Sequence, residues 1–122
     1  MLLTEDDNPG LYKIKSYSPG KLFINEEVVT NSVLITTKIL DAWLPRNLSE
    51  LVDTDWDFIV NYAPEILIIG VGAQFIFPNA KQLAPLYQHQ ISFEMMDTLA
   101  ACRTISILMA EHRDVMGALL ID

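Results

Sequence analysis

The chain has few cysteines and few basic residues, and each shortage excludes a class of protein. Cys102 is the single cysteine among 122 residues, so no intrachain disulfide can form, which is typical of a reducing compartment. The 8 Lys and Arg residues are outnumbered by 16 Asp and Glu, and the lysines are scattered along the sequence. Because nucleic-acid binding draws on clustered basic residues, we expect no nucleic-acid partner.

Long hydrophobic runs are also lacking. The longest apolar run, Ile66 to Ala73, is far shorter than the roughly 20 residues of a membrane-spanning helix, so we expect no direct membrane insertion. The first residues, Met1 to Asp7, are acidic where a secretory or mitochondrial leader would be basic. These features predict a cytoplasmic protein whose partners are neutral, basic or apolar.

The length and the 51% content of hydrophobic residues fit one domain with a core of its own. Residues 1–10 are acidic and close with Asn8-Pro9-Gly10, so we expect a flexible N-terminal segment. Residues 11–122 are then expected to form a single α/β domain.

Alternating or β-branched patterns predict the strands. Residues 11–15 alternate, and the Ser18-Pro19-Gly20 turn leads into a hairpin partner at 21–24, followed by a turn at 25–27. Residues 39–46 look like an irregular crossover. Further strands are predicted at residues 32–37, 65–70, 91–95 and 115–121.

Capping signals predict the helices. Thr54 can cap a helix over 55–62, and Asn47 or Ser49 a short turn before it. Asn79 with Gln82 resembles a capping pair for a short helix that Pro85 interrupts or kinks. Asp97 can cap the longest helix, over 98–112. This order predicts a three-layer α/β domain with a central mixed sheet of about five strands, on which N-terminal hairpin strands and helices pack.

The helix over 98–112 is apolar on nearly all sides, which predicts that it is largely buried. One face carries Ala101, Cys102 and Ile105. A second face holds Arg103 between Leu99 and Ile107. A guanidinium in such a setting cannot simply be desolvated. It either forms a structural salt bridge, snorkels so that its charged end reaches water, or binds an anion in a cleft.

A pair of glycines, Gly70 and Gly72, directly follows the buried strand at 65–70. Ligands of α/β sheets favour this end of a strand, but tight packing explains two glycines about as well. The pattern is neither a dinucleotide fingerprint nor a phosphate loop. Glu94 could pair with Arg103. The candidate cleft therefore consists of Gly70, Gly72, Glu94 and Arg103.

Other chemistry finds little support in the sequence. Cys102 lies a turn inside its helix with no histidine near it in sequence, so we interpret it as a core residue. The acidic stretch Asp53 to Asp57 starts like a calcium loop but has Phe58 where glycine is needed. We predict no catalytic residues, no metal site and no cofactor.

Three segments carry a family resemblance when taken together: 65–72, Phe77-Pro78 and 93–104. They resemble the domain-of-unknown-function 498/598 family, which is related to the mitochondrial NADH dehydrogenase (complex I) assembly factor 3 family. The resemblance implies a three-layer fold with a five-stranded mixed sheet. It also implies a role in binding or assembly and no established enzymatic activity.

Two functions are therefore considered. The favoured one is a non-catalytic protein-interaction or assembly-factor-like module whose partner is another protein. The alternative is a small-molecule binding protein or enzyme that takes an anionic ligand in the candidate cleft. Self-association into a homo-oligomer through a sheet edge is a third alternative. The candidate partner surface consists of Trp43, Phe75 and Phe77.

Overall fold

The computed structural model describes residues 11–122, so the segment 1–10, predicted to be flexible, lies outside the described residues. The helices are the 3-10 turns η1 (Leu48–Glu50) and η2 (Asp53–Trp56) and the α-helices α1 (Asp57–Tyr62), α2 (Ala80–Gln88) and α3 (Thr98–Ala110). The strands are β2 (Ile14–Ser18), β3 (Lys21–Ile24), β4 (Glu27–Val29), β5 (Val33–Ile35), β6 (Leu40–Ala42), β7 (Ile66–Gly70), β8 (Phe93–Met96) and β9 (Val115–Leu119).

The central sheet has five strands in the order β6-β5-β9-β7-β8. β7 is parallel to both β8 and β9, whereas β5 is antiparallel to β9 and β6, so the sheet is mixed as predicted. A smaller antiparallel sheet has the order β2-β3-β4. In the described chain, β8 and β6 are the two edges of the large sheet.

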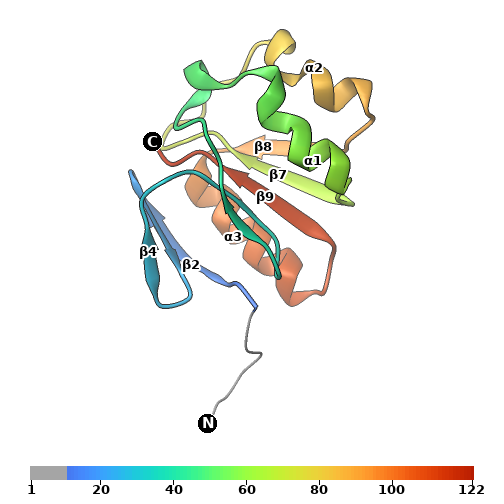
Figure 1. Cartoon of the computed structure of the whole chain (residues 1–122). Helices are drawn as coiled ribbons and strands as arrows, with labels where there is room; N and C mark the ends of the chain where they lie inside the picture. The colour runs from blue at the N-terminus through green and yellow to red at the C-terminus, as the bar shows by residue number, and fades with distance from the viewer. Residues whose placement is uncertain (1–10) are drawn as a thin grey trace.

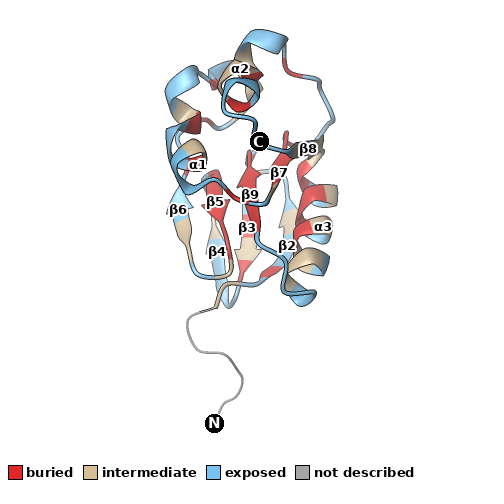
Figure 2. Ribbon diagram, turned by 90° about the vertical axis from the view of Figure 1, so that its right-hand side faces the viewer, coloured by how far each residue is buried: buried red, intermediate tan, exposed pale blue. Residues whose placement is uncertain are grey.

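Three layers result, as Figure 1 shows. α1 and α2 cover one face of the five-stranded sheet, where Trp56, Ile59 and Leu86 pack on Leu67 and Met116. α3 and the small sheet cover the other face. The second core cluster there includes Ile14, Leu22, Ile68, Cys102 and Ile105. The strands β5, β7 and β9 are buried along nearly their whole length between these layers (Figure 2), which confirms the predicted fold class.

Several capping predictions are confirmed. Asp97 caps α3 by accepting the Ala100 N–H at 2.9 Å. Asn79 and Gln82 form a reciprocal capping box at the start of α2. Asn47 caps η1 through the Ser49 N–H at 3.0 Å. These local signals are reliable because the side chain and the amide it satisfies are close in sequence.

Other helix predictions are wrong. Thr54 does not cap a helix, because the 3-10 turn η2 precedes α1 and the Asp55 carboxylate accepts the Val52 N–H at 2.8 Å instead. Pro85 does not interrupt α2, which is continuous from Ala80 to Gln88, and the alternative that it kinks the helix stays a prediction. Pro85 is the sixth of the nine helical residues and removes only one intrahelical hydrogen bond, and the two buried leucines of α2, Leu83 and Leu86, hold the helix on the core.

The expectation that α3 is buried on nearly all sides is also wrong. Ala101, Cys102 and Ile105 are buried as predicted, but Leu99 is 39% exposed and Ile107 is 59% exposed. α3 lies in an outer layer, so only the side that faces the two sheets is covered. Arg103, between these two residues on the helix, is exposed as well.

Candidate functional site

The glycine pair is built into the packing of α3 on β7. A Cβ added to Gly70 would lie 2.8 Å from Thr98 Oγ1 and 3.0 Å from Thr98 Cα, so α3 approaches the strand end closely. Gly72 has φ +107° and a Cβ there would collide with the Asp122 carbonyl oxygen. Both glycines are therefore explained by contacts within the protein.

Thr98 links this turn to the C-terminal residues. Its hydroxyl accepts the Gly72 N–H and donates to the Leu120 carbonyl, each at 2.8 Å, and the residue is fully buried. The Thr98 N–H in turn donates to the Gly72 carbonyl at 2.8 Å. The polar groups of the glycine turn are thus satisfied by α3 and by the end of the chain, which leaves them little capacity for a ligand.

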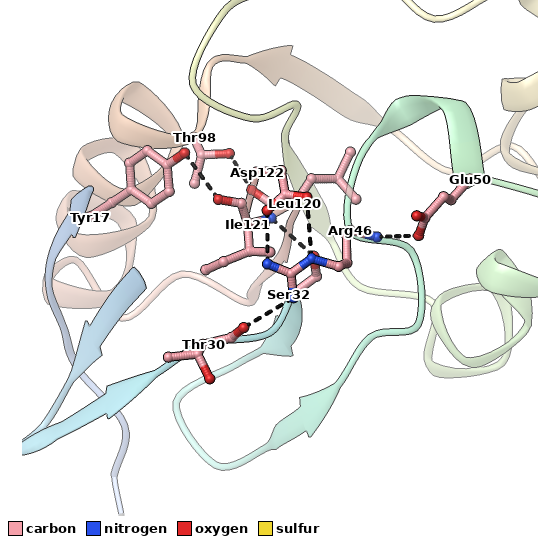
Figure 3. A network of polar contacts seen from close by, with 9 residues as sticks. All are labelled: Tyr17, Thr30, Ser32, Arg46, Glu50, Thr98, Leu120, Ile121 and Asp122. Atoms are coloured by element: carbon pink, nitrogen blue, oxygen red, sulfur yellow. Dashed lines mark hydrogen bonds and ion pairs between the residues drawn. The ribbon is translucent and has the colours of Figure 1, made fainter. Parts of the chain in front are cut away.

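A wider network surrounds the same C-terminal residues (Figure 3). Arg46 makes two hydrogen bonds to the Asp122 carboxylate, at 2.8 and 3.2 Å, and these raise the pKa of the guanidinium. The buried Ser32 hydroxyl accepts the Ile121 N–H at 2.9 Å, and the Tyr17 hydroxyl donates to the Ile121 carbonyl at 3.2 Å. The sequence analysis did not identify this network, because its members are distant in sequence.

Arg103 lies apart from the glycine pair. It follows Thr98 by five positions, which places it about 140° around the helix and about 7.5 Å along it. Neither ion pair in the described chain includes Arg103 or Glu94, so the predicted pairing of these two is not formed. Of the cavities on the described surface, the four best formed do not have Gly70, Gly72 or Arg103 in their walls.

Cys102 is a core residue, as predicted. Its side chain is 4% exposed in the cluster beneath α3, and burial raises the pKa of the thiol to about 12. The thiol is therefore protonated at neutral pH and is not a reactive nucleophile. Residues 11–122 contain no group of three or more His, Cys, Asp or Glu side chains placed to hold a metal ion.

An apolar groove lies beside the edge strand β8. Its volume is about 480 Å³. We call it the β8 groove, and its walls are Phe75, Phe77, Tyr87, Ile91, Phe93, Glu94 and Met95. Phe75 and Phe77 meet edge-to-face at a centroid distance of 5.8 Å, and Tyr87 meets Phe93 in the same way at 5.5 Å.

The groove unites residues that the sequence analysis had placed in different sites. Glu94 was assigned to the candidate cleft, and Phe75 and Phe77 to the candidate partner surface, yet all three line one groove. Phe77 is 68% exposed and Tyr87 62%. Tyr87 was missed, although its position near the end of a short amphipathic helix was a signal for exposure.

Trp43 is not part of this surface. Its side chain is only 5% exposed, its ring packs 5.6 Å from that of Trp56, and its indole N–H donates to the Asp55 carbonyl at 2.9 Å. A tryptophan buried with its N–H satisfied is a core residue. The candidate partner surface is therefore corrected to Phe75 and Phe77 within the β8 groove.

Comparison with known proteins identifies the family. The model of the family "Protein of unknown function (DUF498/DUF598)" matches residues 14–120. The chain belongs to this family. A crystal structure of a Bordetella parapertussis family relative has the same fold, with a TM-score of 0.82 and 28% identity over 95% of this chain and all of that one.

Two curated relatives have different names. A zebrafish (Danio rerio) protein named NADH dehydrogenase [ubiquinone] 1 alpha subcomplex assembly factor 3 is 28% identical over 109 residues, which are 88% of this chain and 63% of that protein. A Francisella tularensis protein named 13 kDa major membrane protein is 21% identical over 94% of this chain and 95% of that protein. In the described part of this chain, no helix has the length and apolarity needed to cross a bilayer. A cytoplasmic location stays a prediction.

Proposed function

We propose that this DUF498/DUF598 chain is a non-catalytic protein-interaction module that assists the assembly of a larger protein complex by binding an extended segment of one subunit. The observation that carries the proposal is the β8 groove, which places exposed aromatic side chains beside an open sheet edge. The segment adds a strand to β8 and inserts apolar side chains into the groove.

The backbone of β8 is available on one side. Leu67 N–H donates to Ser92 O at 3.2 Å and Val71 N–H to Met96 O at 2.9 Å. In a parallel ladder, alternate residues turn their backbone groups toward the same neighbour, so Ser92, Glu94 and Met96 face β7. The N–H and C=O groups of Phe93 and Met95 therefore face outward, where no strand of the described chain pairs with them.

The side chains beside this edge suit a protein partner. Phe75, Phe77 and Tyr87 are all at least half exposed, and aromatic residues are the type most enriched where proteins bind one another. Glu94 is the only charged residue of the groove. Since the whole chain also carries a formal charge of −8, the bound segment is expected to be apolar with neutral or basic flanks.

The name of the zebrafish relative agrees with an assembly role. This chain spans 63% of the zebrafish relative's length, so the proposal concerns the shared domain and leaves the identity of the subunit open. The non-catalytic part of the proposal is also consistent with Cys102, the only cysteine of the chain, because burial raises the pKa of its thiol and so keeps it protonated and unreactive.

The test replaces groove residues in the tagged, full-length chain in its native cells. In the double variant Phe75→Ser/Phe77→Ser, we expect a specific co-purifying protein to be lost, as measured by quantitative mass spectrometry after cross-linking. The matched control is Leu44→Ser, because Leu44 is 87% exposed but lies outside the groove. Because Phe75, Phe77 and Leu44 are all exposed, the free energy of unfolding should change by only about 0.5 kcal/mol in either variant. Retention of every partner by the stably folded double variant would refute the proposal.

A further inference from the structure

A second cavity lies at the other end of α3 from the glycine pair. It has a volume of about 620 Å³, within the range of small-molecule sites. Its walls come from three separate parts of the chain. These are residues 11–15 leading into β2, the turn at 37–38 between β5 and β6, and the segment from Ser106 to Arg113 at the end of α3.

The charge of this cavity is opposite to that of the chain. Four of the eight Lys and Arg residues line it, and none of its twelve lining residues is Asp or Glu, although acidic residues outnumber basic ones two to one in the chain. The lysines that are scattered in the sequence therefore converge in the fold. We call this site the cationic cavity, and its charged or titratable residues are Lys13, Lys15, Lys38, His112 and Arg113.

The backbone that carries these cations is held in place. Lys13 N–H donates to Asn25 Oδ1 at 2.9 Å, and Asn25 N–H donates back to the Lys13 carbonyl at 2.9 Å. The turn at 37–38 is joined to this segment, since Tyr12 N–H donates to the Thr37 carbonyl at 2.8 Å, and within the turn Thr36 Oγ1 accepts the N–H groups of Lys38 and Ile39 at 3.1 and 3.0 Å. Fixed backbone positions reduce the entropy that a ligand must remove on binding.

The end of α3 contributes through an unusual residue. His112 has φ +61°, in the left-handed region where glycine usually closes a helix. His112 N–H donates to the Met109 carbonyl and Arg113 N–H to the Leu108 carbonyl, each at 3.0 Å. This closing motif turns both residues into the cavity wall.

Simpler explanations account for only part of the cluster. A helix C-terminus favours nearby cations, which explains His112 and Arg113 but not the lysines from other elements. Arg113 Nη2 is also 3.8 Å from Glu65 Oε2, but both side chains are about half exposed and such a long surface pair is weak. Lys13, Lys15 and Lys38 take part in neither of the two ion pairs of the described chain.

The walls are apolar as well as cationic. Ile14 is 8% exposed, and the half-buried Tyr12 and Met109 line the same space. We propose that the cationic cavity binds a small organic anion that has an apolar body, such as a carboxylate carried on an acyl chain. The cations bind the head group, and Tyr12, Ile14 and Met109 pack against the body. This site is separate from the β8 groove, so the inference does not depend on the proposed function.

The test uses three soluble probes on the ¹⁵N-labelled full-length chain. Octanoate has both the head group and the body, acetate has only the head group, and octanol has only the body. We expect octanoate to cause saturable amide shifts at Tyr12 to Lys15, Lys38 and His112 to Arg113. Octanol and acetate should bind much more weakly. If either octanol or acetate binds as tightly as octanoate, the proposed ligand class is wrong.

Charge-removing variants locate the binding. Lys13→Gln and Lys38→Gln should each raise the Kd of octanoate roughly two- to fivefold, as loss of one exposed ionic contact does. Lys21→Gln and Lys81→Gln remove the same charge at exposed lysines outside the cavity and should leave the Kd nearly unchanged. Equal weakening by all four variants would mean nonspecific attraction and would overturn the site.

A vesicle experiment separates a soluble ligand from a lipid surface. We expect that the chain does not co-sediment with phosphatidylglycerol vesicles, because its net charge of −8 is repelled by an anionic surface. If the chain binds these vesicles through Lys13 and Lys38 while octanoate causes no shift in the cavity, the cluster recognises a membrane surface and the proposal of a small ligand is wrong.

Discussion

At the scale of single residues, two glycines with the same backbone requirement have very different surroundings. Gly20 and Gly72 both have positive φ, at +83° and +107°. A Cβ on Gly20 would meet nothing within 4 Å, whereas one on Gly72 would collide with the backbone of Asp122. The pair separates the cost of the backbone angle from the cost of the collision.

We therefore predict unequal effects of substitution. Gly20→Ala should lower the free energy of unfolding by about 1–2 kcal/mol, the cost of the angle alone. Gly72→Ala should lower it by about 2–5 kcal/mol, because strain and overpacking add. Urea denaturation of both variants measures the difference. Equal losses would show that the Asp122 backbone makes room for the added Cβ at no cost in stability, which would contradict this account of Gly72.

Cys102 gives a prediction about pH. Burial raises the pKa of its thiol from 9.0 to about 12, so the folded state favours the protonated form. The resulting stabilisation is complete below about pH 9 and is lost as the pH rises toward about 12. The free energy of unfolding should therefore fall as the pH rises from about 9 toward about 12.

In the matched variant Cys102→Ala, the free energy of unfolding should fall less over the same pH range. Tyr17, whose pKa is raised by burial and then by the charge of the ionised Cys102, contributes in the same direction. The difference between the two slopes therefore reports the thiol together with its effect on Tyr17. Identical slopes for the two proteins would contradict the buried, protonated cysteine.

At the scale of elements, the sequence predicts the helices and strands whose signals lie within or next to their own residues. The caps at Asp97 and Asn79 and the buried strand β7 depend on neighbours in sequence and are confirmed. The strands β4 and β6 have three residues each. β4 was not predicted, since the expected turn at 25–27 reaches only its first residue, and β6 falls within the predicted irregular crossover at 39–46. They exist because β3 and β5 pair with them, and no local pattern encodes that pairing.

The open edge of β8 leads to a prediction about proline. Glu94 is inferred to direct its N–H toward β7, so Glu94→Pro should lower the free energy of unfolding by about 3 kcal/mol. Met95 directs its N–H outward, so Met95→Pro should be little less stable than Met95→Ala, which has the same loss of side-chain packing. Denaturant titration of the three variants decides this. If Met95→Pro is as unstable as Glu94→Pro, the inferred direction of the edge is wrong.

At the scale of the molecule, the fold class follows from the order of elements, but the sites do not. The helix that carries Arg103 was expected to be largely buried, but Arg103 is exposed, and Trp43 was expected on a partner surface and is buried. Both depend on which layer covers which side of an element. Likewise, Lys13 and Lys38 are far apart in sequence and line one cavity only after β2 and the β5–β6 turn meet at the end of α3.

The most direct measurement of the central claim is photo-cross-linking with a photoreactive phenylalanine analogue. The analogue replaces Phe77, in the β8 groove, in one variant, and in a second variant it replaces Leu44, which is more exposed but lies outside the groove. After irradiation in native cells, we predict that one protein is cross-linked from position 77 and not from position 44, and that Met95→Pro reduces its yield more than Met95→Ala, which removes the same groove-wall side chain but keeps the outward N–H. Cross-links of the same proteins at equal yield from both positions would contradict a docking groove at β8.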